Sequence, residues 1–174
     1  DPNLDVFPTH RLIHSLPKFD LDALVEKARP LFTVLRREDA PSADVLLEWL
    51  AKEAPTHPAF VLAAGKKAAL LALEPDVDLA AHPTLGALHP ALRKTDVAVL
   101  HSGVLEHVLG ISKEAQAAKT NIRYPQDARA ALADLRAGTG GAQALFLMTA
   151  TPVSQVRDVA EAGDLPHADR SFAG

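Results

Sequence analysis

Histidine and arginine side chains gather near the start of the sequence and are its first candidates for chemistry. His10 and His14 lie four residues apart, with Arg11 between them. On a β-strand, side chains four residues apart point to the same face. The two imidazoles could therefore bind a metal ion or, together with Arg11, an anion. The alternative is an ordinary polar strand face, which these residues favour, so we assign neither a metal ligand nor a catalytic residue.

Strand geometry also separates the immediate neighbours of Arg11. Thr9 and Arg11 would share one face, while His10 and Leu12 would share the other. An anion site would then use the Thr9 hydroxyl and the planar guanidinium of Arg11, and His10 would be structural, held by a buried hydrogen bond. If His10 pointed into the site instead, a turn or bulge would have to re-aim it.

The other histidines give weaker indications of function. His101 and His107 are six residues apart on an expected helix, about 600° of turn, so a shared metal is not expected. His101 is flanked by apolar residues, which favours a buried, hydrogen-bonded role. Four further histidines adjoin prolines and are expected on loop surfaces: His57, His82, His89 and His167.

Two polar segments could in principle hold a phosphate. The glycine-rich run 138–141 follows a helix and precedes a strand, the reverse of a phosphate-cradling loop, so we interpret it as a helix stop and turn. Thr149 and Thr151 stand between an expected strand and an expected helix, where free backbone N–H groups could bind an anion. A simple threonine cap is the favoured alternative there.

Composition excludes several classes of protein. Cysteine is absent, which rules out disulfides, thiolate metal sites and thiol catalysis. Eighteen basic and 22 acidic residues are well mixed along the chain, so we expect no nucleic-acid partner. No apolar run is long enough to span a membrane and no basic amphipathic run suggests membrane binding, so we expect a cytoplasmic protein.

Periodicity and capping residues predict the elements that position these side chains. Asp20 should cap a helix over 21–28. Ser42 should cap a second helix, whose inward-facing residues are Val45, Leu46, Trp49 and Leu50. Asp96 should cap a core helix over 97–109 that ends at Gly110. A hairpin is expected over 59–73, and strands near 7–14, 31–35, 121–124 and 142–148. Helices over 125–137 and 151–163 alternate with the last strands, which favours parallel neighbours.

These elements predict an α/β fold, with α+β as the alternative. We expect a mixed sheet of about 5–7 short strands flanked by about five helices in a single domain over 1–174, with an irregular connection at about 74–95. Because a bacterial chain starts with Met and this one starts with Asp1, either trimming or a missing preceding domain is implied. We expect a fragment of a longer two-domain chain.

Short motifs in order along the chain resemble a bacterial family known as domain of unknown function 1015. They are DP at 1–2, PTHR at 8–11, TDVAVLH at 95–101, VLGI at 108–111, NIRYPQD at 121–127, ALFLM at 144–148 and TPV at 151–153, followed by QV at 155–156, VA at 159–160 and AG at 162–163. The resemblance covers essentially the whole chain. The chain departs from the family in its tail, where residues 165–172 contain no Lys-Ser-Thr run.

The resemblance implies that an upstream region with a Gly-His-His-Arg motif and a ParB/sulfiredoxin-like fold is missing here. Relatives with that fold include nucleotide-using phosphotransferases, among them a free-serine kinase. It therefore implies a C-terminal domain that closes over a nucleotide or phosphate site, with ATP or ADP and Mg²⁺ for the full-length protein. Thr9, His10 and Arg11 would face that site, and His101, Tyr124 and Asp127 would contribute to it.

Two further consequences follow for the isolated chain. It should be inactive, because the motif most suited to chemistry is absent. The alternative function is a non-catalytic interaction or dimerisation module, which exposed apolar area around the hairpin 59–73 would favour. A homodimer is compatible with either function, and the substrate and the direction of phosphate transfer are left open.

Overall fold

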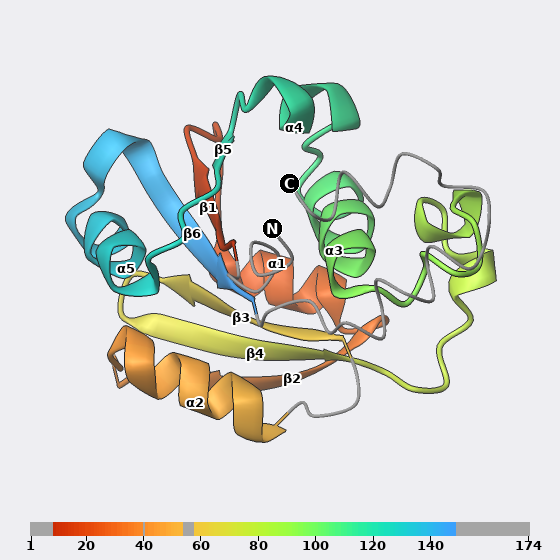
Figure 1. Cartoon of the computed structure of the whole chain (residues 1–174), viewed down its shortest axis with the longest axis horizontal. Helices are drawn as coiled ribbons and strands as arrows, with labels where there is room; N and C mark the ends of the chain where they lie inside the picture. The colour runs from red at the N-terminus through yellow and green to blue at the C-terminus, as the bar shows by residue number, and fades with distance from the viewer. Residues whose placement is uncertain (1–8, 40, 54–57, 149–174) are drawn as a thin grey trace, which may run out of the picture.

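A single sheet of six strands organises the chain in the computed structural model, which describes residues 9–39, 41–53 and 58–148 (Figure 1). The strand order is β2-β4-β3-β6-β1-β5, and every pairing between these strands is antiparallel. The bounds are Arg11–His14 for β1, Phe32–Arg37 for β2, Ala59–Ala64 for β3, Lys67–Leu73 for β4, Ile122–Arg123 for β5 and Ala142–Leu147 for β6.

Helices flank both faces of this sheet. They are α1 (Leu21–Ala28), α2 (Ala43–Glu53), α3 (Asp96–Ala98), α4 (Lys113–Ala118) and α5 (Ala128–Ala137), with a π-helix, η4 (Val99–Glu106), continuing directly from α3. Three short 3-10 turns, Leu79–Ala81, Leu85–Ala87 and Thr139–Gly141, complete the described elements. Strand and helix numbers agree with the expected α/β class.

The expected parallel neighbours are wrong. β5 and β6, joined through α5, do run in the same direction, because each is antiparallel to β1. However, β1 lies between them in the sheet, so they are not neighbours. β1, from the start of the chain, pairs with both β5 and β6 and therefore keeps them from pairing with each other.

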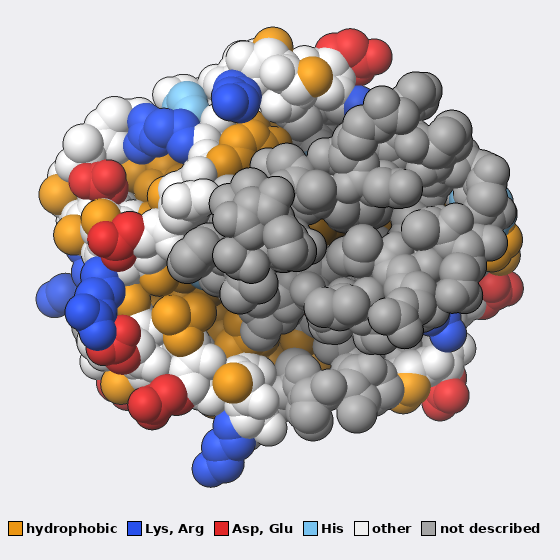
Figure 2. All heavy atoms as spheres, viewed as in Figure 1, with side chains coloured by type: hydrophobic (Ala, Val, Ile, Leu, Met, Phe, Trp, Pro, Cys, Tyr) orange, Lys and Arg blue, Asp and Glu red, His pale blue; other side chains and the backbone are white. Residues whose placement is uncertain are grey.

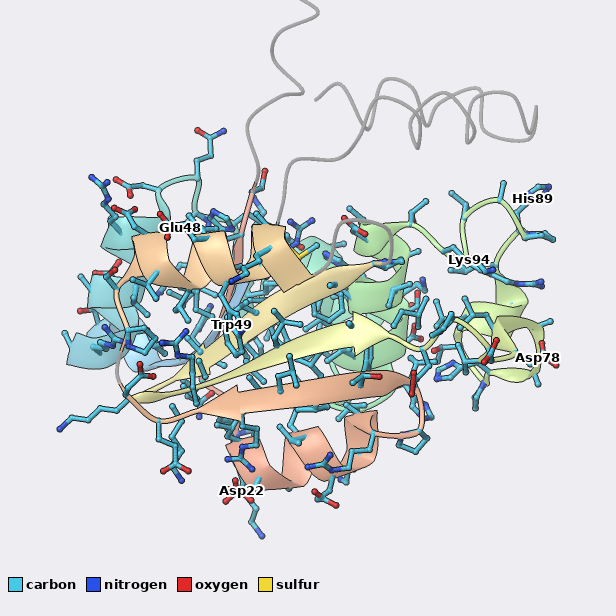
Figure 3. All side chains as sticks on the ribbon, turned by 90° about the horizontal axis from the view of Figure 1, so that it is seen from below. Asp22, Glu48, Trp49, Asp78, His89 and Lys94 are labelled. Carbon is cyan, nitrogen blue, oxygen red and sulfur yellow. The ribbon has the colours of Figure 1, made fainter. Side chains whose placement is uncertain are left out.

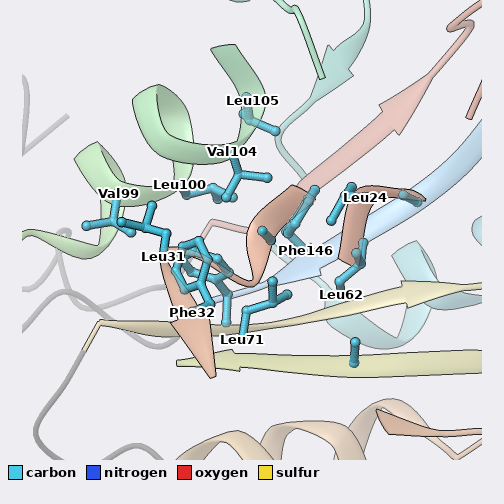
Figure 4. Close-up of a cluster of buried hydrophobic side chains, with 14 of the residues drawn as sticks. Leu24, Leu31, Phe32, Leu62, Leu71, Val99, Leu100, Val104, Leu105 and Phe146 are labelled. Carbon is cyan, nitrogen blue, oxygen red and sulfur yellow. The ribbon is translucent and has the colours of Figure 1, made fainter. Parts of the chain in front are cut away.

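Two hydrophobic clusters divide the core between the two faces of the sheet. One face packs against α1 and the α3–η4 helix, and Figure 4 shows Leu24 of α1 and Leu100, Val104 and Leu105 of η4 around this cluster. The rings of Phe32, Phe60 and Phe146 form an edge-to-face series there, with centroids 5.4 and 6.1 Å apart. The other face packs against α2 and α5. The sheet is thus the middle layer of three.

Local capping rules locate several helix ends correctly, whereas the helix expected from Pro125 begins at Ala128, after its N-cap Asp127. The Asp20 carboxylate accepts from the backbone N–H of Ala23 at 3.1 Å and begins α1, and Gly138 ends α5 with a φ of 71°. The predicted inward face of α2 is only partly right: Leu46 and Leu50 are buried, but Val45 is 39% exposed. The helix expected to begin at Asp96 is capped by Thr95 instead, whose hydroxyl accepts from Ala98 N–H.

The expected hairpin, formed by β3 and β4, is largely buried rather than exposed. Both strands lie inside the sheet, so 59–73 offers no large apolar surface to a partner. The connection that follows is irregular as expected and contains two 3-10 turns. Asp78, His89 and Lys94 mark it at one end of the molecule in Figure 3.

Candidate ligand-binding site

Arg11 is the first residue of β1, and His10 immediately precedes the strand. The Arg11 side chain is buried and its Nε donates to His101 Nε2 at 3.0 Å, across to the η4 layer. His10 is also buried, and its Nδ1 accepts from the backbone N–H of Met148 at 3.0 Å. Leu12 packs in the cluster of α2 and α5. The expectation that a buried hydrogen bond holds His10 is confirmed.

A chain of hydrogen bonds fixes the His101 ring. The Gln116 side-chain nitrogen donates to the carbonyls of Ile111 and His101, at 2.9 and 3.2 Å, so its Oε1 is the acceptor that faces His101 Nδ1 at 2.7 Å. His101 must then carry its proton on Nδ1 and offer the Nε2 lone pair to Arg11. Both ring nitrogens are engaged, and His101 positions Arg11 instead of acting as a base.

Tyr124 forms the third side of this arrangement. Its ring lies parallel to the His101 ring, with centroids 6.2 Å apart and planes at 2°. The Arg11 guanidinium carbon lies 5.3 Å from the Tyr124 centroid, and Lys119 Nζ lies 5.8 Å from it. Both contacts are within cation–π range. We call Arg11, His101, Gln116 and Tyr124 the Arg11 cluster.

Burial sets the protonation states around the cluster. Burial, and then the Arg11 charge, lowers the pKa of His101 to about 4, and the same two causes lower the pKa of His10 to about 4. Both imidazoles are therefore neutral near pH 7. Burial also lowers the pKa of Arg11 and raises that of Tyr124. Arg11 is the cation of the cluster, and no carboxylate in the described part of the chain forms an ion pair with it.

A cavity of about 380 Å³ opens beside the cluster, between the long connection, α3–η4 and α4. His101, Gln116 and Tyr124 form part of its wall, whereas Arg11 does not line it and lies behind His101. The described lining residues are Leu88, Leu92, Thr95, Val97, Ala98, His101, Ser102, Lys113, Gln116, Ala117 and Tyr124.

The other residues predicted for this site, Thr9, Asp127, Thr149 and Thr151, do not have the roles that were expected of them or lie outside the described residues. The Thr9 backbone carbonyl, not its hydroxyl, accepts a short hydrogen bond from Arg11 Nη1. Asp127 is the N-cap of α5, where its carboxylate accepts from Arg129 and Ala130 N–H groups at 2.9 and 3.2 Å. Thr149 and Thr151 lie outside the described residues.

The other described histidines form no metal centre, and His57 and His167 lie outside the described residues. His14 bonds to the adjacent Ser15 hydroxyl at 2.9 Å. His82, expected at a loop surface, is half-buried, and its ring meets His107 edge-on with centroids 4.6 Å apart. Its Nδ1 accepts from two backbone N–H groups, so Nε2 keeps the proton. Across residues 9–39, 41–53 and 58–148, no three His, Asp or Glu side chains could hold a metal ion together.

Sequence reasoning missed three residues of this site: Ser102, Lys113 and Gln116. Lys113 and Gln116 belong to α4, which was not predicted, although Ser112 caps it by accepting from Ala115 N–H at 3.1 Å. The serine was the available indication of this helix. Gln116 could not be recognised, because its role depends on an η4 residue 15 positions earlier.

Comparisons of the chain with known proteins found no match. No family model matches the chain, and neither a curated protein nor a solved structure is significantly similar to it. No helix in the described ranges is long and apolar enough to cross a membrane. On the face shown in Figure 2, the visible basic and acidic side chains are interspersed.

Proposed function

We propose that this chain is the C-terminal domain of a bacterial, cytoplasmic, ParB/sulfiredoxin-like phosphotransferase that uses a nucleotide and acts on a small metabolite such as serine. The observation that carries the proposal is the meeting of Arg11, His101 and Tyr124, which come from three distant segments, beside a cavity. The same three residues belong to the motifs that resemble the family.

The charge of Arg11 supports an anionic ligand. A buried cation is costly unless an anion or a set of hydrogen bonds compensates it. Nε and Nη1 of Arg11 donate to His101 and to the Thr9 carbonyl, and its remaining N–H groups have no acceptor among the described residues. A phosphate oxygen is a suitable acceptor for those groups, because the guanidinium plane binds phosphate through two parallel bonds.

The chemistry itself would reside in the upstream region. No residue of this chain is assigned a catalytic role, since both nitrogens of His101 are already occupied. The described residues offer no metal-binding group, so Mg²⁺ bound to ATP or ADP would be held by that region or by the phosphates. This domain would position the nucleotide or phosphate through Arg11.

The first test is the coding sequence upstream of Asp1. The proposed function requires a Gly-His-His-Arg segment there, and its absence would refute the proposal.

The second test is calorimetric titration of the complete protein with ADP and Mg²⁺. Arg11→Lys keeps a charge but loses the bidentate fork, so we expect about tenfold weaker binding. Arg129→Lys is the matched control, because Arg129 pairs with Asp44 on the exposed surface. Equal affinities of wild type and Arg11→Lys would remove Arg11 from the site.

The alternative function, an interaction or dimerisation module, has no comparable support. The feature that would have favoured it was exposed apolar area on the hairpin 59–73, and both of its strands are largely buried.

A further inference from the structure

The cavity beside the Arg11 cluster has a wall whose hydrogen-bonding groups can be counted one by one. Several of them are already committed inside the protein. The Thr95 hydroxyl donates to the Leu92 carbonyl and accepts from Ala98 N–H. His101 and Gln116 satisfy each other, and the remaining His101 nitrogen accepts from Arg11. None of these groups is left for a ligand.

The uncommitted groups of the wall can all donate. Lys113 Nζ uses one N–H on Ser102 Oγ at 3.1 Å, which leaves two. The Ser102 hydroxyl accepts that bond, and its own proton has no acceptor among the described residues. The Tyr124 hydroxyl has no hydrogen-bond partner in the described part of the chain. Among the described residues, no carboxylate lines the cavity.

The rest of the wall is apolar. Leu88, Leu92, Val97, Ala98 and Ala117 provide most of the surface that a ligand would contact. A volume of about 380 Å³ lies at the lower end of the range of small-molecule sites, roughly 300–1,000 Å³. A single lysine among the lining residues suits one anionic group, whereas a triphosphate requires several cations or backbone N–H groups.

We infer that this cavity binds a small organic anion, in which one carboxylate or monophosphate group is attached to an apolar body. The anionic group accepts hydrogen bonds from Lys113, Ser102 and Tyr124, and the apolar body packs against the leucine, valine and alanine side chains. The inference rests on the proposed function for its biological meaning, because it names the chemical class of the small metabolite, and it disfavours serine itself, which has no apolar body.

Glu106 lies near Lys113 without accepting a hydrogen bond from it. Its Oε1 lies 3.9 Å from Lys113 Nζ, too far for a hydrogen bond, and has no hydrogen-bond partner among the described residues. Glu106 does not line the cavity. The carboxylate therefore attracts the ammonium group toward η4 while the ammonium keeps N–H groups for a ligand.

Binding of three matched probes tests the inference: octanoate, octyl phosphate and octanol, which share an eight-carbon chain and differ in the head group. Binding is followed by amide chemical shifts of the labelled 174-residue chain. We expect at least one anion to bind with shifts at α4 and η4, and octanol to bind at least about tenfold more weakly, as loss of a charged hydrogen bond predicts. Whichever anion binds better identifies the carboxylate or the phosphate as the preferred group.

Three variants locate the site. Lys113→Gln should weaken binding of the anion about tenfold, and Ala117→Phe, which fills the cavity from an exposed position, should abolish it. Lys52→Gln, an exposed change on α2, should bind as wild type does. Thermal melts confirm that each variant is folded, and if Lys113→Gln is not, Ala117→Phe decides.

Absence of binding by both anions, equal binding of octanol, or unchanged binding by folded Lys113→Gln or Ala117→Phe would overturn the inference. These outcomes can be distinguished from the nucleotide test. Wild type and Arg11→Lys can bind ADP equally while octanoate still binds to the cavity, and octanoate can fail to bind while Arg11→Lys weakens ADP binding.

Discussion

Acid should weaken this fold through two buried histidines, and His10→Asn isolates the contribution of one of them. The pKa of His10 is lowered to about 4, against 6.5 in an unfolded chain. Between these values the unfolded chain binds more protons than the folded one, so the free energy of unfolding falls as pH drops through this window. His101 acts in the same direction, because its pKa is also about 4.

The size of the effect follows from the shift. Between about pH 7 and about pH 4.5, a histidine whose pKa falls from 6.5 to about 4 loses on the order of 2 kcal/mol of stability. In His10→Asn the amide oxygen can take the place of Nδ1 and accept from Met148 N–H, but it does not titrate. The variant should therefore lose about 2 kcal/mol less than the wild type over this range.

Urea unfolding followed by tryptophan fluorescence measures this directly, because Trp49 is the single tryptophan and is half-buried on α2. Ala51→Gln is the control, since it is an exposed change on α2 that introduces no titrating group, and it should follow the wild-type pH dependence. Parallel curves of unfolding free energy against pH for wild type and His10→Asn would refute the assignment of His10 as a buried neutral base.

Three further predictions concern packing, capping and activity. Leu100→Ala truncates a fully buried η4 side chain and should lower the unfolding free energy by roughly 2–4 kcal/mol. Val45→Ala, at an exposed position, should change it little. Equal melting temperatures of the two variants would contradict this prediction. Asp127→Ala removes the N-cap of α5 and should lower the free energy of unfolding by about 1 kcal/mol. Asp134→Ala is the control, and equal denaturation midpoints of these two variants would refute the prediction. The isolated chain incubated with ATP or ADP and serine should form no phosphoserine, and clear turnover by the pure chain would disprove the assignment of the chemistry to an upstream region.

Local chemistry predicted the elements better than their arrangement. Asp20, Ser42 and Gly138 act within a turn or two of the chain, so their effects can be recognised without knowing the fold. Strand pairing depends on distant segments: β6 pairs with both β3 and β1, and nothing in its apolar sequence specifies either neighbour. The expectation of parallel neighbours failed for this reason.

The candidate site was predictable in its residues more than in its geometry. The Arg11 and His10 side chains bond to different partners, His101 Nε2 and the backbone N–H of Met148, and neither partner could be identified from the local sequence. The apolar residues over 97–109 also fit an α-helical period, and π-helices are rare, so the sequence did not reveal the π-helix that carries His101. Gln116, which sets the His101 tautomer, lies on a helix of only six residues, too short for periodicity to detect.

The position of β6 has a consequence for how the chain acquires its structure during synthesis. β6 is the last strand among the described residues, yet it lies between β3 and β1 and is the only described strand that joins them. Until residue 147 has left the ribosome, β2, β3 and β4 can form one antiparallel ribbon and β1 with β5 another, but the two cannot become one sheet. Long-range pairings of this kind fold slowly. We expect the nascent chain to expose two apolar strand edges, those of β3 and β1, until β6 inserts between them.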